Sequence, residues 1–490
     1  MKIRELIKSL DLLEGEPNLL DDFQVKGISC NSKQVSDNFV FVAVKGTRED
    51  GNRFIDEAIE NGARAIVLEG SRVGELESSK SVSFIQVKDT RRACAQLATL
   101  FFGNPSSKIK VVGITGTNGK TTVSYLLEAA LKEARVQPSV IGTINYRFKD
   151  KIIPSKNTTP GPIELQSILS NMLKEGINYC LMEVSSHAMD QDRTEGIDFH
   201  SAIFTNLTQD HLDYHKTLGK YFLAKAKLFK DINPNSFVVI NNDDKYGLRL
   251  KKLTKAKIIT YGIENKADVA ARDIKLDSLG TEFRLLLPGR EIKFRSQLIG
   301  RHNVYNLLAS VAWAFEAGID TSIIESSLQG PTLVPGRLQR IDFEGDFSVF
   351  VDYAHTEDAL KNIIQTLRSL SRKRIIVVFG CGGERDKNKR PKMGRVVSRL
   401  SDYAIVTNDN PRWEDPDEII NDIKRGIRKN NYCVIPERRQ AIKKSLSMAK
   451  AGDIVLVAGK GHENYQIIKD KVINFDDCQV IRECLRLLNY

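Results

Sequence analysis

Short apolar runs separated by polar turns dominate the first part of the chain. The runs FVFVAV (39–44), ARAIVLEG (63–70) and SVSFIQV (81–87) have the length and composition of buried strands. A helix-like stretch, TRRACAQLATLFFG, follows them and leads into NPSS at 104–107, where we expect a hinge. The pattern therefore predicts a small N-terminal α/β domain over residues 1–90.

The middle of the chain opens with KVVGIT at 110–115, which has the pattern of a buried strand. A glycine-rich turn joins it to a segment with helical periodicity, from Lys120 to Ala134. Three further strands and one long helix are predicted at 180–185, 201–207, 236–242 and 304–318. Strands that alternate with helices indicate a mainly parallel sheet, so we predict a central α/β domain over residues 91–335.

From residue 347 the alternation of strand and helix becomes regular. The strands FSVFVDY, RIIVVFG, DYAIVTN, YCVIP and DIVLVAG each precede a polar loop, and a helix-length segment follows the first four. This order is typical of a doubly wound, Rossmann-like parallel sheet, which we predict over residues 336–490. Ligands bind such sheets at the carboxyl ends of the strands, so function is expected in the loops DYAHTED, GCGGERD, TNDNPRWED and AGKGHEN.

Composition and charge narrow the class of protein. Among 490 residues, 41% are hydrophobic and 28% charged, the balance of a folded globular chain. No apolar run approaches the roughly 18 residues of a membrane span, and the charged start MKIRELIKSLDLLEGE does not resemble a signal peptide, so we expect a cytoplasmic protein without membrane insertion.

The seven cysteines lack metal-ligand spacing, which indicates reduced thiols. The net charge of +11 suits nucleic acid or an anionic small substrate, and its even spread favours the second.

The strongest motif is the glycine-rich turn itself, which reads GITGTNGKTT between a strand and a helix. Glycines let backbone N–H groups face phosphate oxygens, while Lys120 would neutralise the β- and γ-phosphates and the Thr121 hydroxyl would bind Mg²⁺. The spacing departs from the strict phosphate-loop pattern because Ile114 stands at the first glycine position. A purely structural turn is the alternative. The predicted ATP contacts of this loop are Gly116, Thr117, Asn118, Gly119, Lys120, Thr121 and Thr122.

The sequence TGTNGKTT resembles the form that this loop takes in the Mur ligase family, and the resemblance extends in order over essentially the whole chain. These ATP-dependent ligases add amino acids to a UDP-linked muramoyl peptide through an acyl phosphate. The resemblance is greatest to the members that add the third peptide residue. It implies three domains that bind UDP-sugar, ATP and amino acid in that order, with UDP-MurNAc-L-Ala-D-Glu as acceptor, and we expect a monomer.

Three residues beyond the phosphate loop are candidates for holding metal. Glu183 in EVSSH and His211 in HLDYH would offer, with Thr121, oxygen and imidazole donors that suit Mg²⁺. The resemblance makes Glu183 and His211 ligands of a second Mg²⁺, and it implies that Lys225 in YFLAKAKLF is carbamylated by CO₂. We therefore predict that Lys120, Lys225 and His211 are catalytic. On the residues alone, each of Glu183, His211 and Lys225 could be structural or on the surface.

Further polar residues match the family's contacts to the UDP-sugar peptide. They are Ser32 for the uridine, and Thr158, Thr159, Ser185, Gln191 and Arg193 for the muramoyl peptide. Ordinary loop polarity would explain the same residues without the resemblance. At Lys33 the family usually has arginine, and lysine cannot form a bidentate fork, so we assign Lys33 no role.

The resemblance also implies contacts to ATP outside the phosphate loop. Asn303, in GRHNVYN, matches the adenine side, and Arg337 and Asp352 match the residues by which the third domain closes on the nucleotide. His355 would help to organise the same loop.

The last prediction concerns the amino acid that is added, which we expect to be meso-2,6-diaminopimelate. This amino acid differs from L-lysine by one distal carboxylate, so the site needs a cation there. Arg412, in the Asp409-Asn410-Pro411-Arg412 loop, offers a planar fork for a carboxylate, while Asp409 and Asn410 can orient the distal ammonium. By resemblance Arg385, Gly459 and Glu463 complete the site. A surface role for Arg412, and with it the use of L-lysine, is the alternative.

Three other interpretations compete with this one. An ATP-driven protein that acts on nucleic acid needs surfaces where aromatic and basic side chains stack on bases. This chain has only two tryptophans and its charge is dispersed, so we expect no nucleic-acid partner. A folylpolyglutamate-type ligase shares the phosphate loop and the carbamate lysine, but it would lack the uridine segment and the DNPR loop. A nucleotide-sensing module would leave DNPR and GKGHE unexplained.

Overall fold

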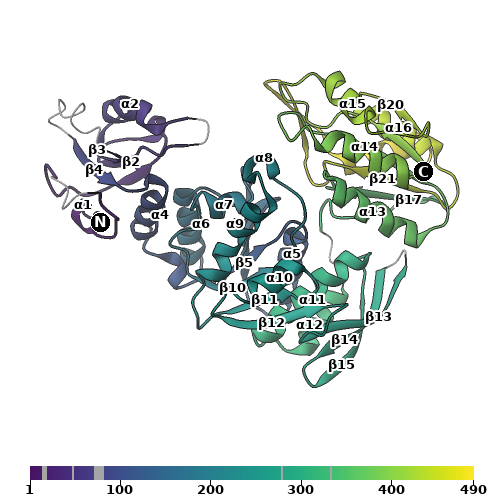
Figure 1. Cartoon of the computed structure of the whole chain (residues 1–490), viewed down its shortest axis with the longest axis horizontal. Helices are drawn as coiled ribbons and strands as arrows, with labels where there is room; N and C mark the ends of the chain where they lie inside the picture. The colour runs from purple at the N-terminus through teal and green to yellow at the C-terminus, as the bar shows by residue number, and fades with distance from the viewer. Residues whose placement is uncertain (14–18, 47–48, 71–81, 278–279, 331–333) are drawn as a thin grey trace.

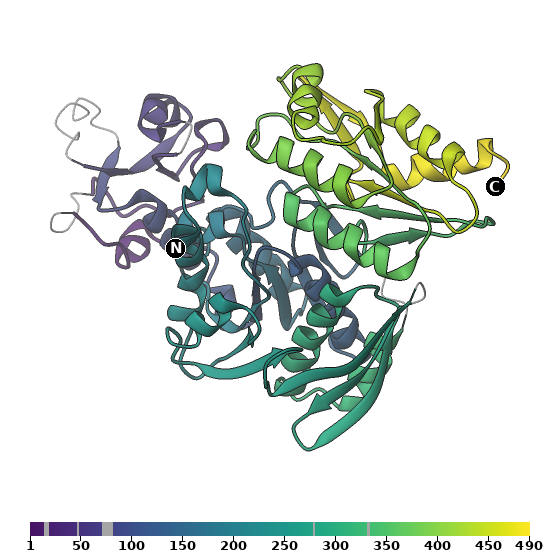
Figure 2. The ribbon, with the colours of Figure 1, turned by 45° about the vertical axis from the view of Figure 1, so that its right-hand side comes forward.

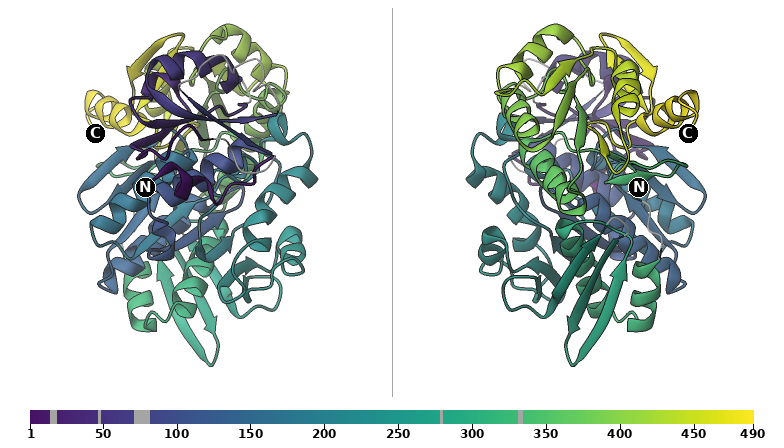
Figure 3. Two further views of the ribbon diagram at one scale, coloured as in Figure 1. Left: turned by 90° about the vertical axis from the view of Figure 1, so that its left-hand side faces the viewer. Right: turned by 90° about the vertical axis from the view of Figure 1, so that its right-hand side faces the viewer.

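The structure, a computed structural model, describes residues 1–13, 19–46, 49–70, 82–277, 280–330 and 334–490 (Figure 1). Three large sheets follow one another along the chain, each covered by helices, and the described residues add a two-stranded sheet of β22 (Tyr465–Ile468) and β23 (Lys471–Asn474). This confirms the predicted α/β class. Figure 1 shows the N-terminal part at the left and the C-terminal part at the upper right of the central part, and Figures 2 and 3 show the same arrangement from other sides. Within the described ranges, no helix is long and apolar enough to cross a membrane.

The N-terminal part is a parallel sheet of four strands in chain order. Its strands are β1 (Gly27–Ser29), β2 (Phe39–Val42), β3 (Ala63–Glu69) and β4 (Ser83–Val87). The helices α1 (Ile3–Ile7) and α4 (Thr90–Phe101) cover one face, and α2 (Ile55–Glu60) covers the other. All three predicted strands are present, although residue 81 at the start of the third lies outside the described residues.

Helix α4 lies where we predicted the first domain boundary, between residues 90 and 91. Ala93, Cys94 and Leu97 on this helix are buried in the core of the small sheet, while another side of the helix contacts α6 (Pro162–Lys174) of the central part. The helix therefore joins the two parts, and the division into residues 1–90, 91–335 and 336–490 remains a prediction.

The central sheet has eleven strands in the order β15-β14-β13-β12-β11-β10-β5-β9-β6-β7-β8. The seven strands from β13 to β6 are parallel to their neighbours, and antiparallel strands extend the sheet at both edges. The strands are β5 (Lys110–Thr115), β6 (Pro138–Ile141), β7 (Asn145–Phe148), β8 (Lys151–Pro154), β9 (Tyr179–Glu183), β10 (Phe199–Phe204), β11 (Phe237–Asn241), β12 (Lys257–Gly262), β13 (Val269–Asp277), β14 (Gly280–Leu287) and β15 (Arg290–Ser296).

Helices cover both faces of the central sheet, so the inner parallel strands such as β5 and β11 are mainly apolar and buried. One face packs on α5 (Lys120–Glu133), α11 (Arg301–Glu316) and α12 (Thr321–Gln329). The other packs on α6, α9 (Leu218–Lys230) and α10 (Lys245–Leu250). Two short helices, α7 (Ser186–Asp190) and α8 (Leu212–His215), follow β9 and β10 at their carboxyl ends.

The C-terminal part is a six-stranded sheet in the order β16-β17-β21-β18-β19-β20. The strands are β16 (Gln339–Ile341), β17 (Ser348–Asp352), β18 (Ile375–Phe379), β19 (Tyr403–Val406), β20 (Tyr432–Val434) and β21 (Ile454–Ala458), and β16 alone is antiparallel. The helices α13 (Glu357–Leu370), α14 (Lys389–Leu400) and α15 (Pro416–Lys424) cover one face; α16 (Arg438–Met448) and α17 (Asp477–Leu487) cover the other. The predicted doubly wound sheet, with its five parallel strands, is confirmed.

Candidate active site

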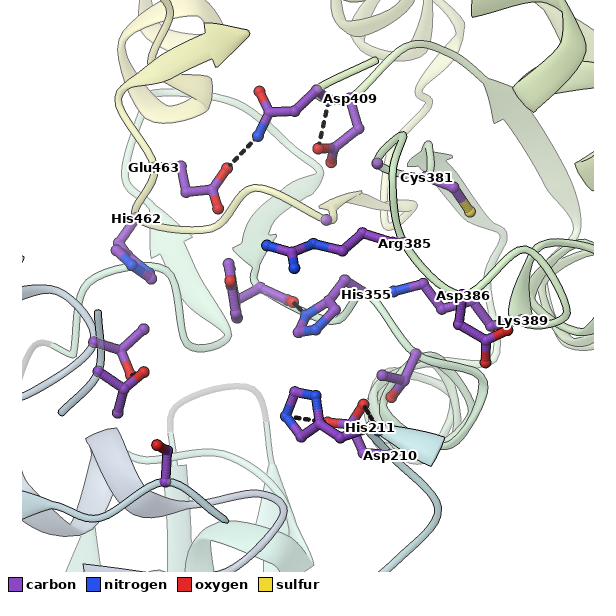
Figure 4. A pocket seen from close by; sticks show the side chains of 18 of the residues that line it. Asp210, His211, His355, Cys381, Arg385, Asp386, Lys389, Asp409, His462 and Glu463 are labelled. Atoms are coloured by element: carbon purple, nitrogen blue, oxygen red, sulfur yellow. Dashed lines mark hydrogen bonds and ion pairs between the residues drawn. The ribbon is translucent and has the colours of Figure 1, made fainter. Parts of the chain in front are cut away.

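A cavity of about 1030 Å³ lies between the carboxyl ends of the C-terminal strands and loops of the central part (Figure 4). It brings together residues that are far apart in the sequence. The predicted site residues on its wall are Thr158, Ser185, Arg193, His211, Arg385, Asp409, Asn410, Arg412, Gly459 and Glu463. The residues predicted for the muramoyl peptide and those predicted for the amino acid thus face one space.

Two predicted peptide-binding residues lie just behind the wall and hold others in place. Gln191 accepts hydrogen bonds from Arg193, from Nε at 3.0 Å and from Nη2 at 2.6 Å. Arg193 Nη1 donates to the carbonyl of Thr159 at 3.0 Å, and the Thr159 hydroxyl accepts from the backbone N–H of Ser185 at 3.0 Å. These four residues form one connected network beside the cavity.

Ser32 lies in the N-terminal part and not on the wall of this cavity. Its side chain is buried, and its hydroxyl donates to the carboxylate of Glu57 at 2.5 Å. The structure therefore places the predicted uridine residue apart from the others.

The phosphate loop connects β5 to the first turn of α5, as its sequence predicts. Gly116 has φ 148°, and a Cβ there would lie 1.9 Å from the Thr205 hydroxyl, so only glycine fits. The ammonium of Lys120 donates to the carbonyls of Gly116 at 2.9 Å and Thr117 at 3.0 Å, which folds it over the loop. Burial lowers the pKa of Lys120. The lysine is thus held where phosphate charge would lie.

Thr121 and Glu183 meet beside this loop. Glu183 has a side chain that is 1% exposed, and the hydroxyl of Thr121 donates to its Oε2 at 3.0 Å. Thr143, which the sequence analysis missed, donates to the same carboxylate from its hydroxyl at 2.8 Å and its N–H at 3.2 Å. A carboxylate and hydroxyls are oxygen donors that Mg²⁺ accepts, so Thr121 and Glu183 fit the ion expected beside phosphates.

Lys225 is buried, although a lysine on a helix is normally exposed. Its residue is 2% exposed, and its Nζ donates to the Gly116 carbonyl at 2.9 Å and contacts the Thr115 hydroxyl at 3.4 Å. Burial, and then the charge of Lys120, lowers the pKa of Lys225 well below its ordinary value. Lys227, two residues on, instead pairs with Asp192 at 3.1 Å. The structure therefore brings Lys225 to the phosphate loop.

His211 lies on the cavity wall, with its ring 4.8 Å from that of His187 and its Nε2 3.4 Å from Asp210 (Figure 4). Burial lowers the pKa of His211 to about 4, against the opposing effect of Asp210, so its ring is neutral at neutral pH. In the described part of the chain, no three His, Cys, Asp or Glu side chains gather closely enough to hold a metal ion. The structure thus brings Thr121 and Glu183 together but does not join His211 to them.

Arg337 reaches from the C-terminal part to the phosphate loop. Its Nη2 donates to the Thr121 hydroxyl at 3.3 Å, and its guanidinium lies over the Tyr353 ring, 4.6 Å from the centroid. Asp352 holds the turn that carries Arg337, because its carboxylate accepts from the N–H groups of Leu338 at 2.6 Å and Ala354 at 2.7 Å. Burial raises the pKa of Asp352, against the charge of Arg337.

The two asparagines of GRHNVYN lie on α11, behind the phosphate loop. Asn303 donates to the carbonyl of Ile299 at 2.9 Å and accepts from Asn306 at 2.9 Å. A Cβ at Gly119 would lie 2.3 Å from Asn306 Oδ1, so Asn306 is the one that touches the loop. Asn303 is buried behind it.

The DNPR loop follows β19 at the carboxyl edge of the sheet. Arg412 has φ 55°, and its Nη1 donates to the carbonyl of Gly383 at 2.7 Å. The side chain of Arg412 therefore lies against the GCGGERD loop. Arg385 projects into the cavity in Figure 4, and it has no hydrogen bond or ion pair to another described residue. Two guanidinium groups therefore border the same part of the cavity.

The remaining predicted residues for the amino acid form one cluster. Asn410 Nδ2 donates to Glu463 Oε2 at 2.9 Å (Figure 4). Gly459, with φ 114°, lies against Asp409, since a Cβ there would be 2.8 Å from Oδ2. Burial and the charge of Asp409 raise the pKa of Glu463. Burial alone would raise the pKa of Asp409 too, but Lys460 and Arg438 hold it below its usual value.

Sequence reasoning missed two buried residues at this cluster. Lys460 stands between the glycines of GKGHE, and Arg438 opens α16, where its Nη2 donates to the carbonyl of Ala458 at 3.0 Å and its Nη1 to that of Asn408 at 3.4 Å. Their charge balances Asp409, Glu463 and Asp477. The position of Lys460 inside a polar loop was the one signal that could have found it.

The chain is similar to known proteins along its whole length. Three family models match the chain: "Mur ligase family, catalytic domain" over residues 24–102, "Mur ligase middle domain" over 114–314, and "Mur ligase, glutamate ligase domain" over 336–461. The UDP-N-acetylmuramoyl-L-alanyl-D-glutamate–2,6-diaminopimelate ligase of Clostridium tetani is 42% identical over 490 residues, which is all of both chains. The ligase of the same name from Aquifex aeolicus is 46% identical over 463 residues, 94% of each chain.

Solved structures give the same relationship. A UDP-N-acetylmuramoyl-L-alanyl-D-glutamate–2,6-diaminopimelate ligase superposes with a TM-score of 0.70 at 31% identity, covering 100% of this chain and 99% of the other. The MurF ligase of Thermotoga maritima in complex with ADP shares the fold, with a TM-score of 0.63 at 22% identity over 94% and 97% of the two chains. The folylpolyglutamate synthase of Mycobacterium tuberculosis also shares it, with a TM-score of 0.62 at 18% identity over 76% and 92%. With relatives above 40% identity along its whole length, the chain belongs to the Mur ligase family.

Proposed function

We propose that the chain is an ATP-dependent amide ligase that adds meso-2,6-diaminopimelate to UDP-MurNAc-L-Ala-D-Glu, a step of peptidoglycan precursor synthesis. One observation carries the proposal. The loop with Arg412, Asn410 and the loop with Glu463 face the same cavity as Thr158 and Arg193, so an amino acid and an acyl acceptor would meet there. The names of the relatives from C. tetani and A. aeolicus support this choice of substrates.

The chemistry explains why the site needs ATP. A carboxylate resists attack by an amine, and transfer of the γ-phosphoryl group to it gives an acyl phosphate with a good leaving group. The amine then attacks, and the tetrahedral intermediate expels phosphate. Lys120 and Arg337 would neutralise the charge that moves with the phosphoryl group, because both contact the loop expected to hold it. Closure around the cavity would exclude water from the acyl phosphate.

Mg²⁺ supplies further neutralisation of phosphate charge when it is bound. Thr121 and Glu183 are the residues best placed to hold it, while His211 lies on the cavity wall without a contact to either. The buried Glu183 carboxylate has neutral hydrogen-bond partners in the hydroxyls of Thr121 and Thr143, which leaves its negative charge available to a cation.

Lys225 is the proposed carbamate. The ammonium first releases a proton to solvent, and the neutral amine then attacks CO₂ and releases a second proton, so the side chain changes from a cation to an anion. The burial that lowers the pKa of Lys225 favours the neutral amine, and its contact with Gly116 puts the new charge beside the phosphate loop. The carbamate would supply negative charge near the metal without another acidic residue.

The amino acid would lie among the four C-terminal loops. Arg412 and Arg385 would bind its distal carboxylate, while Glu463 and Asp409 would receive its distal ammonium and Asn410, which donates to Glu463, would hold the carboxylate of Glu463 in place. L-lysine has no distal carboxylate and would leave a guanidinium without its partner. The use of L-lysine in place of diaminopimelate is the second candidate function.

The remaining proposals concern the setting of the reaction. The substrates are ATP, UDP-MurNAc-L-Ala-D-Glu and meso-diaminopimelate, and the N-terminal part with Ser32 would bind the uridine after the domains close. We place the reaction in the cytoplasm and expect a monomer that binds neither nucleic acid nor a membrane.

An assay of ATP-dependent phosphate release tests the proposal against its competitors. The purified protein is given UDP-MurNAc-L-Ala-D-Glu with diaminopimelate, a folate with glutamate, or DNA. Release only with the UDP-linked dipeptide and an amino acid would support the proposal. Release with the folate or DNA, and none with the dipeptide, would contradict it.

A further inference from the structure

Lys460 is a fully buried lysine beside the predicted amino-acid site. Its side chain is 0% exposed and points into the cluster of Asn410 and Glu463. Its ammonium donates to Asn410 Oδ1 at 3.2 Å and to Glu463 Oε2 at 3.2 Å, and it lies over the Tyr465 ring, 5.5 Å from the centroid. Burying a charge is costly unless it is paired, so these contacts account for its place in the protein.

The contact of Lys460 with Asn410 sets the direction of the asparagine amide. Asn410 Oδ1 accepts from Lys460 and from the N–H of Ile467 at 3.0 Å, so both of its acceptor positions are filled by donors. The Nδ2 group must then face the other way, where it donates to Glu463. One Nδ2 hydrogen remains for a ligand in the cavity.

The contact of Lys460 with Glu463 sets the charge of the site. Glu463 and Asp409 are two carboxylates in a buried cluster, and each would favour protonation of the other. The ammonium of Lys460 opposes this for both, and it uses only Oε2 of Glu463. The other oxygen, Oε1, is left to receive the ammonium of an incoming amino acid.

We propose that Lys460 is a positioning residue for amino-acid selection: its ammonium holds Glu463 by Oε2 and Asn410 by Oδ1, which leaves Glu463 Oε1 to accept from the distal ammonium of the substrate and one Nδ2 hydrogen of Asn410 to donate to a substrate carboxylate. The inference rests on the proposed function, since it deepens the role of the same site. It gives Lys460 no part in the transfer of the phosphoryl group, because its contacts lie among the amino-acid loops and not at the phosphate loop.

The experiment compares wild type with Lys460→Met, which has a side chain of similar length without charge, and with Lys460→Arg, which keeps the charge. For Lys460→Met we expect KM for the amino acid to rise at least about tenfold, the size of a lost hydrogen bond to a charged group. KM for ATP and for the UDP-linked dipeptide should change less than about twofold, and Lys460→Arg should recover part of the loss. Equal increases in all three KM values, or no increase at all, would overturn the inference.

Arg374→Met serves as the matched control. Arg374 pairs with Asp453 at the amino-terminal ends of β18 and β21, so its loss weakens the same sheet at the edge away from the site. We expect a lower thermal midpoint with an unchanged KM for the amino acid. If KM for the amino acid rises as much in Arg374→Met as in Lys460→Met, the rise is caused by lower stability, and the inference is overturned.

A double variant keeps the test available if Lys460→Met does not fold. Lys460→Met with Glu463→Gln removes both charges of the pair. Because only the contact with Asn410 is then left to lose, KM of the double variant should exceed that of Glu463→Gln by less than about tenfold, and a further rise of tenfold or more would contradict the proposal. All KM values refer to the amino acid that wild type uses best, so failure of wild type to use diaminopimelate counts against the proposed function alone.

Discussion

At the scale of single residues, the account depends on charges that are held in place before any ligand arrives. Lys120, Lys225 and Lys460 are all drawn into hydrogen bonds with loops of the cavity or the phosphate site. Sequence could indicate Lys120, because its motif places it after glycine at a helix start. Sequence pattern alone gave no sign that Lys225 and Lys460 are buried, since burial follows from tertiary packing.

Arg412 is the residue that should separate diaminopimelate from L-lysine. We expect Arg412→Ala to lose discrimination by a factor on the order of 10², because wild type would leave a partly buried guanidinium without its carboxylate partner when it binds lysine. The ratio of kcat/KM for the two amino acids measures this. The exposed neighbour Trp413 offers a control, since Trp413→Ala leaves the guanidinium in place. Unchanged selectivity in Arg412→Ala would contradict the assignment.

Lys225 should be required for catalysis through its carbamate. We expect Lys225→Ala to lose at least about 10²-fold in kcat, because a charge near the transferred phosphoryl group is missing. Lys227→Ala is the control, since Lys227 lies on the same helix but pairs with Asp192. Incorporation of isotopically labelled CO₂ into wild type, and its absence from Lys225→Ala, would identify the carbamate. Equal activity of Lys225→Ala and wild type would exclude it.

At the scale of elements, the sequence predicted most of the parallel strands but missed the parallel strands β1, β6, β12 and β13 and all the antiparallel ones. Strand β5, helix α5 and the five parallel strands of the C-terminal sheet were predicted because buried strands are continuous apolar runs. The hairpins β7–β8 and β22 (Tyr465–Ile468) with β23 (Lys471–Asn474) were not predicted. Strands β8 and β23 are exposed along their whole length, so no run of buried residues marks them.

The phosphate loop is the element whose backbone geometry is most constrained. Replacement of Gly116 by alanine puts a Cβ 1.9 Å from the Thr205 hydroxyl, so we expect the loop to shift and KM for ATP to rise at least about tenfold. Gly176→Ala is the matched control, because Gly176 has φ 76° but an open environment. Its substitution should cost some stability and leave KM for ATP unchanged. Similar KM values for both variants and wild type would show that the loop tolerates the Cβ.

At the scale of the whole molecule, two of the three parts meet at the site. The wall of the cavity comes from the central and C-terminal parts, and Arg337 makes a direct hydrogen bond from one to the other at Thr121. The residue types at this junction could be predicted by resemblance, but their distances could not, because they depend on how the parts pack. Ser32, in the N-terminal part, lies outside the cavity.

Buried histidines make the stability of the molecule depend on pH. Burial lowers the pKa of His302 and His355 to about 4 and that of His462 to about 3. An unfolded histidine has a pKa of about 6.5, so the unfolded chain binds more protons below that value. Stability should be complete above about pH 6.5 and should be lost as the pH falls toward about 4.

Thermal denaturation measured from about pH 7.5 down to about pH 5 tests this dependence. We expect the midpoint to fall along the series, and His302→Gln to reduce the slope because one titrating group is removed. A midpoint that stays constant or rises on acidification would contradict the assignment of these histidines as neutral.

The central claim is that the protein joins diaminopimelate to the UDP-linked dipeptide. The most direct measurement is kcat/KM of wild type for meso-diaminopimelate and for L-lysine, at saturating ATP and UDP-MurNAc-L-Ala-D-Glu, with the product identified by mass. The account predicts a UDP-MurNAc-tripeptide that contains diaminopimelate and a kcat/KM on the order of 10²-fold above that for lysine. Equal use of the two amino acids, or no tripeptide with either, would contradict it.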